Sequence, residues 1–367
     1  MHVINSTFSV LMLILGGISC TSSPVERQTS DNPANEPRLT HRFEVTPVEA
    51  DNRIDITIDG DLFTSYLYPS SIMKPVLFPL VAADGTEVTR GFPVSPKPGE
   101  RMDHRHHVGF WFNYGEVNEL DFWGHSEATD PGESARYGTI DHIETVETIS
   151  GDKRGVLRVK MRWNNSKGKT LIEENTTFIF RANENLRFID RITTLTAVDE
   201  IVHFNDSKEG ALAIRVARFL EQPSDKPEIL TDANGNPTDV PLVDNEGVRG
   251  LYFSSEGLEG DDVWGTRAKW VQLAAEKDGV PYSVVIMDHQ DNPGHPTFWH
   301  ARGYGLFAAN PFGQKVFSEG KLEMNFRLQP GEPITFRHRV MIASDEVLNM
   351  EQLDSHYQQF ITQAGSI

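Results

Sequence analysis

Six of the thirteen histidines lie in two short segments of the chain. The first segment contains His104, His106 and His107, directly before the run Gly109–Phe112. If this segment enters a β-strand, His104 and His106 point to one side and His107 to the other. Two imidazoles on one strand face, with a third from another strand, can hold a divalent metal. The same pair can instead place a general base beside an orienting partner, and surface histidines on a polar loop are the plainer interpretation.

The second segment, residues 287–313, combines the other three histidines with residue types suited to sugar binding. Trp299, His300, Arg302 and Tyr304 follow one another closely there. A planar indole can stack on the apolar face of a pyranose ring, and a guanidinium can bind a carboxylate through two hydrogen bonds. These residues indicate one wall of a binding site, unless Trp299 belongs to the core and Arg302 is only a solvated charge.

A third candidate is the Lys208-Glu209 pair, which precedes the apolar run Ala211–Ile214. A carboxylate that faces inward at the start of a strand can transfer a proton or ligate a metal. Adjacent Lys and Glu residues are more often solvated charges, so both interpretations stay open.

The overall charge limits the classes of partner. The 367 residues carry a formal net charge of −19, which argues against nucleic acid, because phosphate binding depends on basic surface. The same charge disfavours docking to anionic lipid. The only cysteine is Cys20, so intramolecular disulfides, thiolate zinc sites and a cysteine nucleophile in the body are excluded.

The N-terminus has the pattern of an export signal. Residues 1–19 carry no Lys, Arg, Asp or Glu, and Phe8–Leu15 is an apolar run of the length of a signal core. Cys20 follows small residues, as the lipidated cysteine of a bacterial lipoprotein does, although the usual leucine three positions earlier is Gly17 here. Residues 20–41 are polar and form a flexible tether. We therefore expect an exported, lipid-anchored cell-envelope protein; a plain secretory signal is the alternative.

The body, residues 43–367, is rich in predicted strands and forms one domain. Apolar and polar residues alternate in many short runs separated by turn signals. The predicted strands are Phe43–Val48, Ile54–Ile58, Phe63–Tyr68, Gly109–Phe112, Leu157–Trp163, Thr176–Phe180, Phe188–Thr196, Ala211–Leu220, Lys269–Ala274, Tyr282–Met287 and Phe336–Ile342. Helical spacing occurs only over Asp345–Gln363, and residues 221–265 read as a surface insertion. Many strands without intervening helices predict an all-β fold, a large twisted β-sandwich of the mutarotase-like or lyase-like supersandwich kind, with one C-terminal helix.

Four segments together resemble one bacterial family. They are KPVLFPLVAADGTEVTRGFP, DHRHHVGFWFNYGEVNELDFW, SKEGALAIRVA and WHARGYGLFAANPFG, which begin at Lys74, Asp103, Ser207 and Trp299. In this order they resemble the PmoA-type "methane oxygenase" family from about Phe63 to Ile342, although Val108 stands where that family has an arginine. The resemblance implies an exported protein of glycan degradation, with some relatives similar to lyases or dehydratases that act on uronates. An oxygenase activity is disfavoured, because no run of about 20 apolar residues exists for a membrane-embedded enzyme.

The resulting hypothesis is an enzyme that cleaves acidic, uronate-containing oligosaccharides by elimination. Such chemistry needs a cation for the carboxylate, a base for the neighbouring carbon's proton, and an acid for the leaving oxygen. Arg302 or a histidine-bound metal would supply the cation, His106 or His300 the base, and Tyr304 or Glu209 the acid. The alternative is a surface lipoprotein that binds glycans without catalysis.

The remaining candidate residues share a role in binding rather than chemistry. The expected substrate-binding residues are Arg302, Lys208, Arg215, Trp111, Trp123, Trp299 and Asn113, with the three tryptophans as sugar platforms. The expected ligands of a possible divalent metal ion are His104, His106 and His289. The partner is an oligosaccharide, with no nucleic acid, and the membrane is contacted only through the lipid anchor.

Overall fold

The computed structural model describes residues 40–363, so the predicted signal, Cys20 and most of the tether lie outside the described residues. Residues 40–363 belong to one compact unit. Within this range no helix is both long and apolar enough to cross a membrane.

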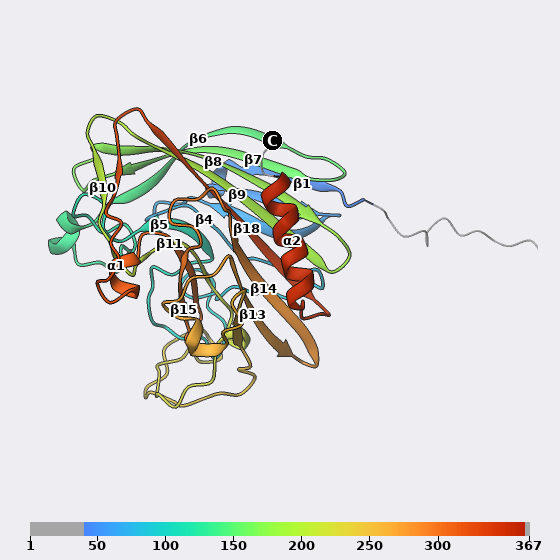
Figure 1. The fold of residues 1–367 in the computed structure, drawn as a ribbon. Helices are drawn as coiled ribbons and strands as arrows, with labels where there is room; N and C mark the ends of the chain where they lie inside the picture. The colour runs from blue at the N-terminus through green and yellow to red at the C-terminus, as the bar shows by residue number, and fades with distance from the viewer. Residues whose placement is uncertain (1–39, 364–367) are drawn as a thin grey trace, which may run out of the picture. The chain divides into compact units, whose positions relative to one another are not determined.

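Two eight-stranded antiparallel sheets make up the fold (Figure 1). The first sheet has the spatial order β1 (Phe43–Val48), β2 (Arg53–Ile58), β3 (Asp61–Leu67), β4 (Val76–Leu77), β5 (Phe110–Tyr114), β11 (Gly210–Arg215), β16 (Leu306–Asn310) and β15 (Phe298–Arg302). The second has the order β12 (Leu251–Ser254), β13 (Trp270–Lys277), β14 (Val280–Asp288), β18 (Pro333–Ser344), β9 (Leu186–Ala197), β8 (Thr170–Ala182), β7 (Gly155–Asn164) and β6 (Thr139–Ile149). A two-stranded sheet pairs β10 (Val202–Phe204) with β17 (Phe326–Leu328).

The two large sheets enclose the main core between their inner faces. Alternation along each strand sends every second side chain into this core. In β5, Phe110 and Phe112 face inward, and in β18, Phe336 and Val340 do the same. The large inward aromatics include Trp163 and Trp299, both fully buried. The predicted all-β sandwich is therefore confirmed.

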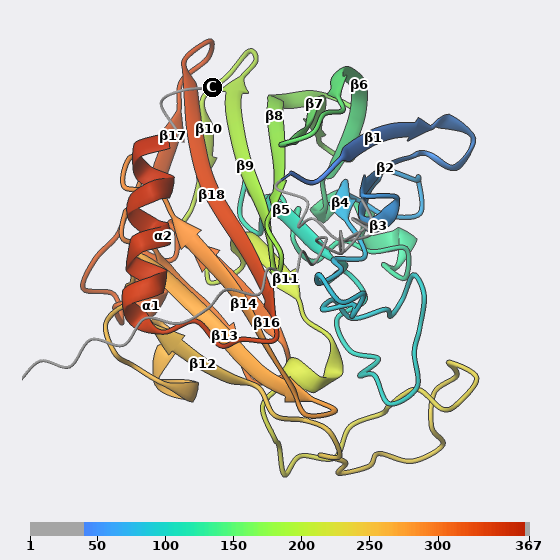
Figure 2. The ribbon, with the colours of Figure 1, turned by 90° about the vertical axis from the view of Figure 1, so that its right-hand side faces the viewer.

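One long helix covers the outer face of the second sheet. Helix α2 (Met350–Gln363) places Leu353, Tyr357 and Phe360 against outward side chains of that sheet, such as Trp270 and Met341. Figure 2 shows α2 lying along the strands of this sheet. The predicted C-terminal helix is present and begins at Met350. The other helices are short: α1 (Gln314–Phe317) and the 3-10 turns η1 (Glu49–Asp51), η2 (Pro131–Arg136), η3 (Arg218–Leu220) and η4 (Gly260–Val263).

Within residues 40–363, the outer face of the first sheet carries only the short helix α1 at its β15 edge, where Phe317 contacts His300. Loops cover the rest of this face, and they bury a small cluster that includes Val108, Trp111, Trp123 and Ala308. The long irregular segment 221–250, which connects η3 to β12, forms the loops at the bottom of Figure 1. Most of the predicted insertion is thus irregular, although its C-terminal part contains β12 and η4.

Candidate functional site

Four neighbouring strands of the first sheet present one row of outward side chains. Ala213 of β11 is paired with Trp111 of β5 on one side and with Ala308 of β16 on the other, and Ala308 is paired with His300 of β15. Two alanines therefore separate two large side chains across the sheet. Arg215 lies one outward position further along β11 and is fully buried. The loops that carry the candidate site residues cover this row of side chains.

The loop before β5 carries the first histidine segment, and one buried arginine organises it. The Arg90 guanidinium donates hydrogen bonds to the carbonyl oxygens of Arg101, Asp103, His104 and His107, at 2.9 to 3.2 Å, and to Asp103 Oδ1 at 2.7 Å. Such a set uses the rigid fork of a guanidinium, which a lysine ammonium cannot reproduce.

Gly109 ends this loop and begins the approach to β5. Its φ is +57°, and a Cβ there would lie 2.3 Å from the carbonyl oxygen of Leu77. Only glycine fits this left-handed, closely packed position, so the direction in which the histidine loop leaves the sheet is fixed by the sequence.

Asp103 is the electrostatic centre of the loop. Its Oδ1 accepts hydrogen bonds from both buried arginines, Arg90 at 2.7 Å and Arg215 at 2.6 Å. Its Oδ2 contacts Nδ1 of His104 at 2.8 Å. Burial alone would raise the pKa of the Asp103 carboxyl, but the hydrogen bond from His104 and the charges of Arg215 and Arg90 outweigh it, so that the pKa lies below its usual range. Asp103 therefore stays ionised.

His104 has the geometry of an oriented base. Its Nδ1 is held by Asp103, which leaves Nε2 as the nitrogen available to a substrate, and its side chain is 40% exposed. The ring stacks in parallel on His107 at 4.8 Å and on Tyr304 at 5.0 Å between centroids. The backbone of His104 has φ +41°, a left-handed conformation that costs free energy in a non-glycine residue and is concentrated at functional sites. The carboxylate–imidazole pair is the arrangement that fixes the tautomer of a catalytic histidine.

Tyr304 lies in the turn between β15 and β16, next to this pair. Its ring covers the Arg215 guanidinium at 4.9 Å, and the Arg302 guanidinium lies 5.9 Å from the same ring. Burial raises the pKa of Tyr304 to about 12, against the opposing charges of Arg215 and Arg302. The phenol therefore remains protonated near neutral pH and can donate a proton or a hydrogen bond.

His106 and His107 are neutral histidines of the same loop. Burial, together with the nearby charge of Lys74, lowers the pKa of His106 to about 2, and burial also depresses the pKa of His107. A base with so low a pKa removes protons poorly. His104, whose Nδ1 is held by Asp103, is therefore a better candidate for the base than the predicted His106. His107 is buried, with its Nδ1 3.3 Å from Arg215 and its ring stacked on Trp111.

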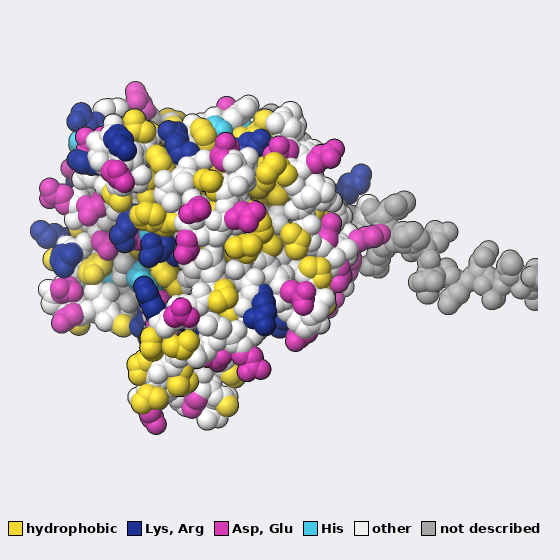
Figure 3. All heavy atoms as spheres, turned by 60° about the horizontal axis from the view of Figure 1, so that its bottom comes forward, with side chains coloured by type: hydrophobic (Ala, Val, Ile, Leu, Met, Phe, Trp, Pro, Cys, Tyr) yellow, Lys and Arg dark blue, Asp and Glu magenta, His cyan; other side chains and the backbone are white. Residues whose placement is uncertain are grey.

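Two cavities open beside the histidine loop. The first, about 440 Å³, is lined by Arg101, Gln222, Trp264, Arg302 and Tyr304 among others. Its insertion-loop wall is tied down by Arg101, which donates to buried Glu221 at 2.7 Å and contacts Glu228 at 2.6 Å. The second cavity, about 320 Å³, is lined by Lys74 and His106 among others. In the view of Figure 3, most Lys and Arg side chains lie in the left half of the molecule, whereas Asp and Glu side chains are spread over the whole visible face.

His300, Lys208 and Glu209 form a separate group near β15, the edge strand of the first sheet. His300 is buried, its Nδ1 donates to the Lys208 carbonyl oxygen at 2.8 Å, and burial lowers its pKa to about 4. Lys208 is exposed and pairs with Glu209. The negative charge of Glu209 partly offsets the effect of burial on the pKa of His300, and it also contributes to the raised pKa of Tyr304. The group therefore lies within electrostatic reach of the histidine loop. Among residues 40–363, however, no hydrogen bond or ring contact joins His300 to the histidines of residues 104–107.

Comparison with known proteins identifies the family but not an activity. A family of unknown function, DUF6807, matches residues 53–358. The chain belongs to the DUF6807 family. The expected membership of the PmoA-type "methane oxygenase" family is therefore wrong, because the matching family model carries no such activity. No curated protein matches the sequence.

Solved structures resemble this DUF6807 member in fold. A galactose 1-epimerase from Lactobacillus acidophilus NCFM is 10% identical with a TM-score of 0.34, and the match covers 83% of this chain and 99% of the epimerase. A GH36 α-galactosidase from Geobacillus stearothermophilus is 13% identical with a TM-score of 0.37, covering 84% and 42%. An α-galactosidase from Lactobacillus brevis is 11% identical with a TM-score of 0.37, covering 88% and 42%. The chain thus spans about two fifths of the length of the α-galactosidases it matches.

Several residues predicted to bind substrate have structural positions instead. Trp299 points into the core, because it alternates with His300 along β15, and its Nε1 donates to the Ala268 carbonyl oxygen at 3.0 Å. Asn113 is buried and bridges the Trp111 indole to the Phe122 carbonyl oxygen. Trp111 and Trp123 are outward but covered, so neither ring face is open to a sugar. The exposed aromatic that lines a cavity is Trp264, under the Arg302 guanidinium at 5.5 Å.

The histidines expected to ligate a metal ion do not come together. His289 follows β14 and packs against Phe360 of α2, on the outer side of the second sheet, whereas His104 and His106 lie over the first sheet. No three His, Cys, Asp or Glu side chains in the described part of the chain are placed to hold a metal ion. The carboxylate of this loop, Asp103, is already engaged by Arg90 and Arg215, two buried cations that would repel a dication. The histidines predicted as ligands therefore do not form a divalent-metal site, and the chemistry is derived below without one.

Sequence reasoning missed the residues whose role depends on burial. No motif in the sequence marks Arg90, Asp103 or Lys74. Two weaker signals were available. Lys74 and Arg90 lie in Lys74–Pro93, one of the four segments that carry the family resemblance, and Asp103 directly precedes the first histidine.

Proposed function

We propose that this DUF6807 member is a carbohydrate-active enzyme that cleaves acidic oligosaccharides by elimination. The observation that carries the proposal is the chain Asp103–His104–Tyr304: a partly buried carboxylate orients an exposed imidazole, which lies flat against a protonated phenol. A base and an acid side by side are what a β-elimination needs.

The charge around this pair favours an anionic substrate. Arg215 lies under the Tyr304 ring, and Arg302 stands at its exposed side, while the protein as a whole is strongly acidic. Arg302 has its planar fork free to bind a carboxylate through two hydrogen bonds, since among the described residues it contacts only the Trp264 and Tyr304 rings. Trp264 offers the adjacent surface for the sugar ring.

The reaction follows from these positions. Arg302 binds the substrate carboxylate and stabilises the negative charge that develops beside it. His104 Nε2 removes the proton from the carbon that bears the carboxylate. The electron pair forms a double bond to the neighbouring ring carbon, the bond from that carbon to the glycosidic oxygen breaks, and the leaving oxygen takes the proton of the Tyr304 hydroxyl. His104 and Tyr304 then exchange their protons with water.

The direct test is turnover by the purified protein on a panel of uronate-containing oligosaccharides, followed by ultraviolet absorbance of the new carbon–carbon double bond. We expect Tyr304→Phe to lower turnover by roughly 100- to 10,000-fold, because the leaving oxygen loses its proton donor. The matched control is Tyr357→Phe, which removes a hydroxyl from α2 on the other sheet. Binding of the panel without any product would favour the glycan-binding alternative and reject elimination.

The proposed location is the cell envelope, through a lipid on Cys20. Cys20→Ala is expected to move the protein from the membrane fraction to the soluble fraction while leaving its thermal unfolding unchanged, because the anchor precedes the folded body. Fractionation and immunoblotting measure the first, and calorimetry the second. Recovery of the wild-type protein in the soluble fraction would reject the anchor.

A further inference from the structure

The second cavity contains a buried cation that the proposed reaction does not use. Lys74 precedes β4, and its side chain is only 2% exposed. Its ammonium donates one hydrogen bond, to the His106 carbonyl oxygen at 2.7 Å, and lies 5.3 Å above the Trp111 ring. An ammonium has three donors, so two of them have no partner among the described residues.

No carboxylate compensates this charge. No acidic side chain in residues 40–363 lies within ion-pair distance of Lys74, and the nearest acidic influence, from Asp121, acts only at longer range. Asp121 itself is occupied, since its Oδ1 accepts from the backbone of Trp123 and Gly124. Burial without a counter-ion lowers the pKa of Lys74 to about 7. A buried, unpaired charge is costly and is seldom retained without a use.

The cavity around Lys74 has the size and lining of a small-ligand site. Its volume of about 320 Å³ is at the lower end of the range for such sites. The walls are mostly apolar and include Ile72, Val94 and Val108, while His106 and His125 contribute imidazole rings. At the rim, Arg105 donates to Glu127 at 2.7 Å, so the acidic residue beside the cavity is already paired.

We propose that this cavity binds the carboxylate of a second acidic sugar residue, with Lys74 at its floor. The carboxylate would accept the two unused ammonium donors and supply the missing counter-ion. The cavity lies next to the reaction site, because the His106 ring lies 5.7 Å from the His104 ring, and the His104 ring lies 5.0 Å from the Tyr304 ring, between centroids. The substrate is then a chain with at least two acidic residues. Its identity as a sugar rests on the proposed function, but carboxylate binding at Lys74 does not require elimination.

Binding of D-glucuronate, with D-glucose as the neutral control, tests this inference by titration calorimetry on the full chain. Arg302→Met serves as the background, so that binding at the reaction site is weakened. In that background we expect glucuronate to bind at least tenfold more tightly than glucose. Lys74→Met should abolish this preference without lowering the melting temperature, because it removes an uncompensated buried charge while keeping the volume. Lys160→Met, an exposed lysine paired with Glu144, is the matched control and should change neither.

A second variant blocks the cavity without touching its charge. Val94 is 43% exposed at the cavity wall, so Val94→Trp can fill the opening while the protein stays folded. We expect it to weaken glucuronate binding at least tenfold. Equal affinities for glucuronate and glucose in the background, or unchanged glucuronate affinity in Val94→Trp, would overturn the inference. Either result leaves the elimination assay unaffected, so the two proposals fail separately.

Discussion

Replacing His104 with alanine is expected to lower turnover of an acidic oligosaccharide by roughly 100- to 10,000-fold, the range that a positioned general base supplies. Stability should change little. The imidazole is 40% exposed, so its removal leaves no closed cavity, and Asp103 keeps its two arginine partners. Initial rates from double-bond absorbance and a urea unfolding curve measure the two effects.

The chain provides a matched control for His104→Ala. His41 Nδ1 contacts Asp59 at 2.8 Å, the same carboxylate–imidazole distance, just before β1 at the other edge of the first sheet from β15. His41→Ala should leave turnover unchanged. A chelator should also leave wild-type turnover unchanged, because the loop's donor set does not fit a divalent metal. Full activity of His104→Ala, or inactivation by a chelator that an added divalent ion reverses, would contradict the assignment.

Arg90→Met is expected to cost about 3–5 kcal/mol of unfolding free energy, the usual result of removing one partner from a buried ion pair. The loss has two sources. Four backbone carbonyls of the histidine loop lose their donor, and Asp103 retains only Arg215 as a cationic partner. Turnover should fall in parallel, because the loop positions His104. Urea unfolding followed by tryptophan fluorescence gives the free energy.

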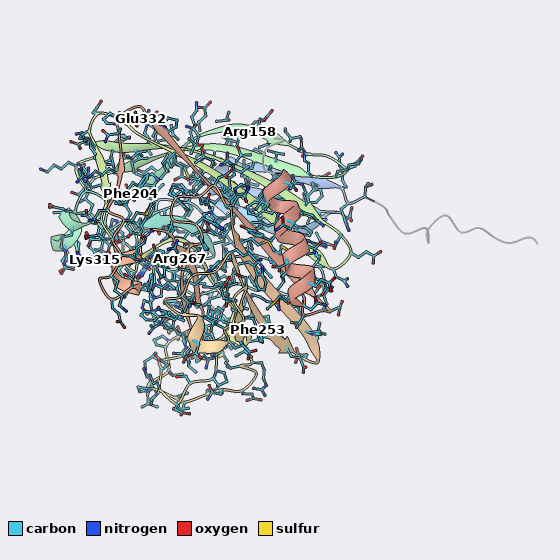
Figure 4. All side chains as sticks on the ribbon, in the orientation of Figure 1. Arg158, Phe204, Phe253, Arg267, Lys315 and Glu332 are labelled. Carbon is cyan, nitrogen blue, oxygen red and sulfur yellow. The ribbon has the colours of Figure 1, made fainter. Side chains whose placement is uncertain are left out.

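The control for this variant is Arg158→Met. Arg158 lies on β7 at the rim of the second sheet (Figure 4) and pairs with Glu147, with both side chains about two-fifths exposed. Exposed pairs contribute less than about 1 kcal/mol, so this variant should unfold nearly as the wild type does. If Arg90→Met were equally mild, the loop would be held by other contacts and its organisation by Arg90 would be rejected.

The fold was predictable because the strand pattern is local. Alternation predicted both ends of β1, Phe43–Val48, correctly, and it predicted the ends of most other long strands to within a few residues. The pattern missed the short strands β12, β15 and β16 and the long strand β6. Strand β6 has two register shifts against β7, which put Ile143 and Val146 on the exposed side, and so it shows no clean period. The predicted strand Ala211–Leu220 ends early at Arg215, since its last residues form the turn η3.

The site was only partly predictable, because its chemistry depends on which side chains are buried together. The clustering of the histidines in residues 104–107 indicated a candidate site, but these residues lie in a loop rather than a strand, so alternation could not predict which side chain is oriented. That choice depends on Asp103, which directly precedes His104, and on Arg90 and Arg215, which come from other segments of the chain. Trp299 shows the opposite failure, since its type indicated sugar binding while its place in β15 sends it inward.

The histidine loop and segment 221–250 contribute different parts of the candidate site, and this has a consequence for how members of the family can differ. The segment contributes Gln222, Lys226 and Glu228 to one wall of the first cavity and meets the fold through the Arg101–Glu221 ion pair. The groups proposed to transfer protons, His104 and Tyr304, come from elsewhere in the chain. Exchange of this segment between relatives, cut just after Glu221, should therefore transfer preference for the incoming sugar while leaving the bond-breaking step in place. Segment 221–250 is therefore the part of the chain at which we expect engineering of substrate range to begin.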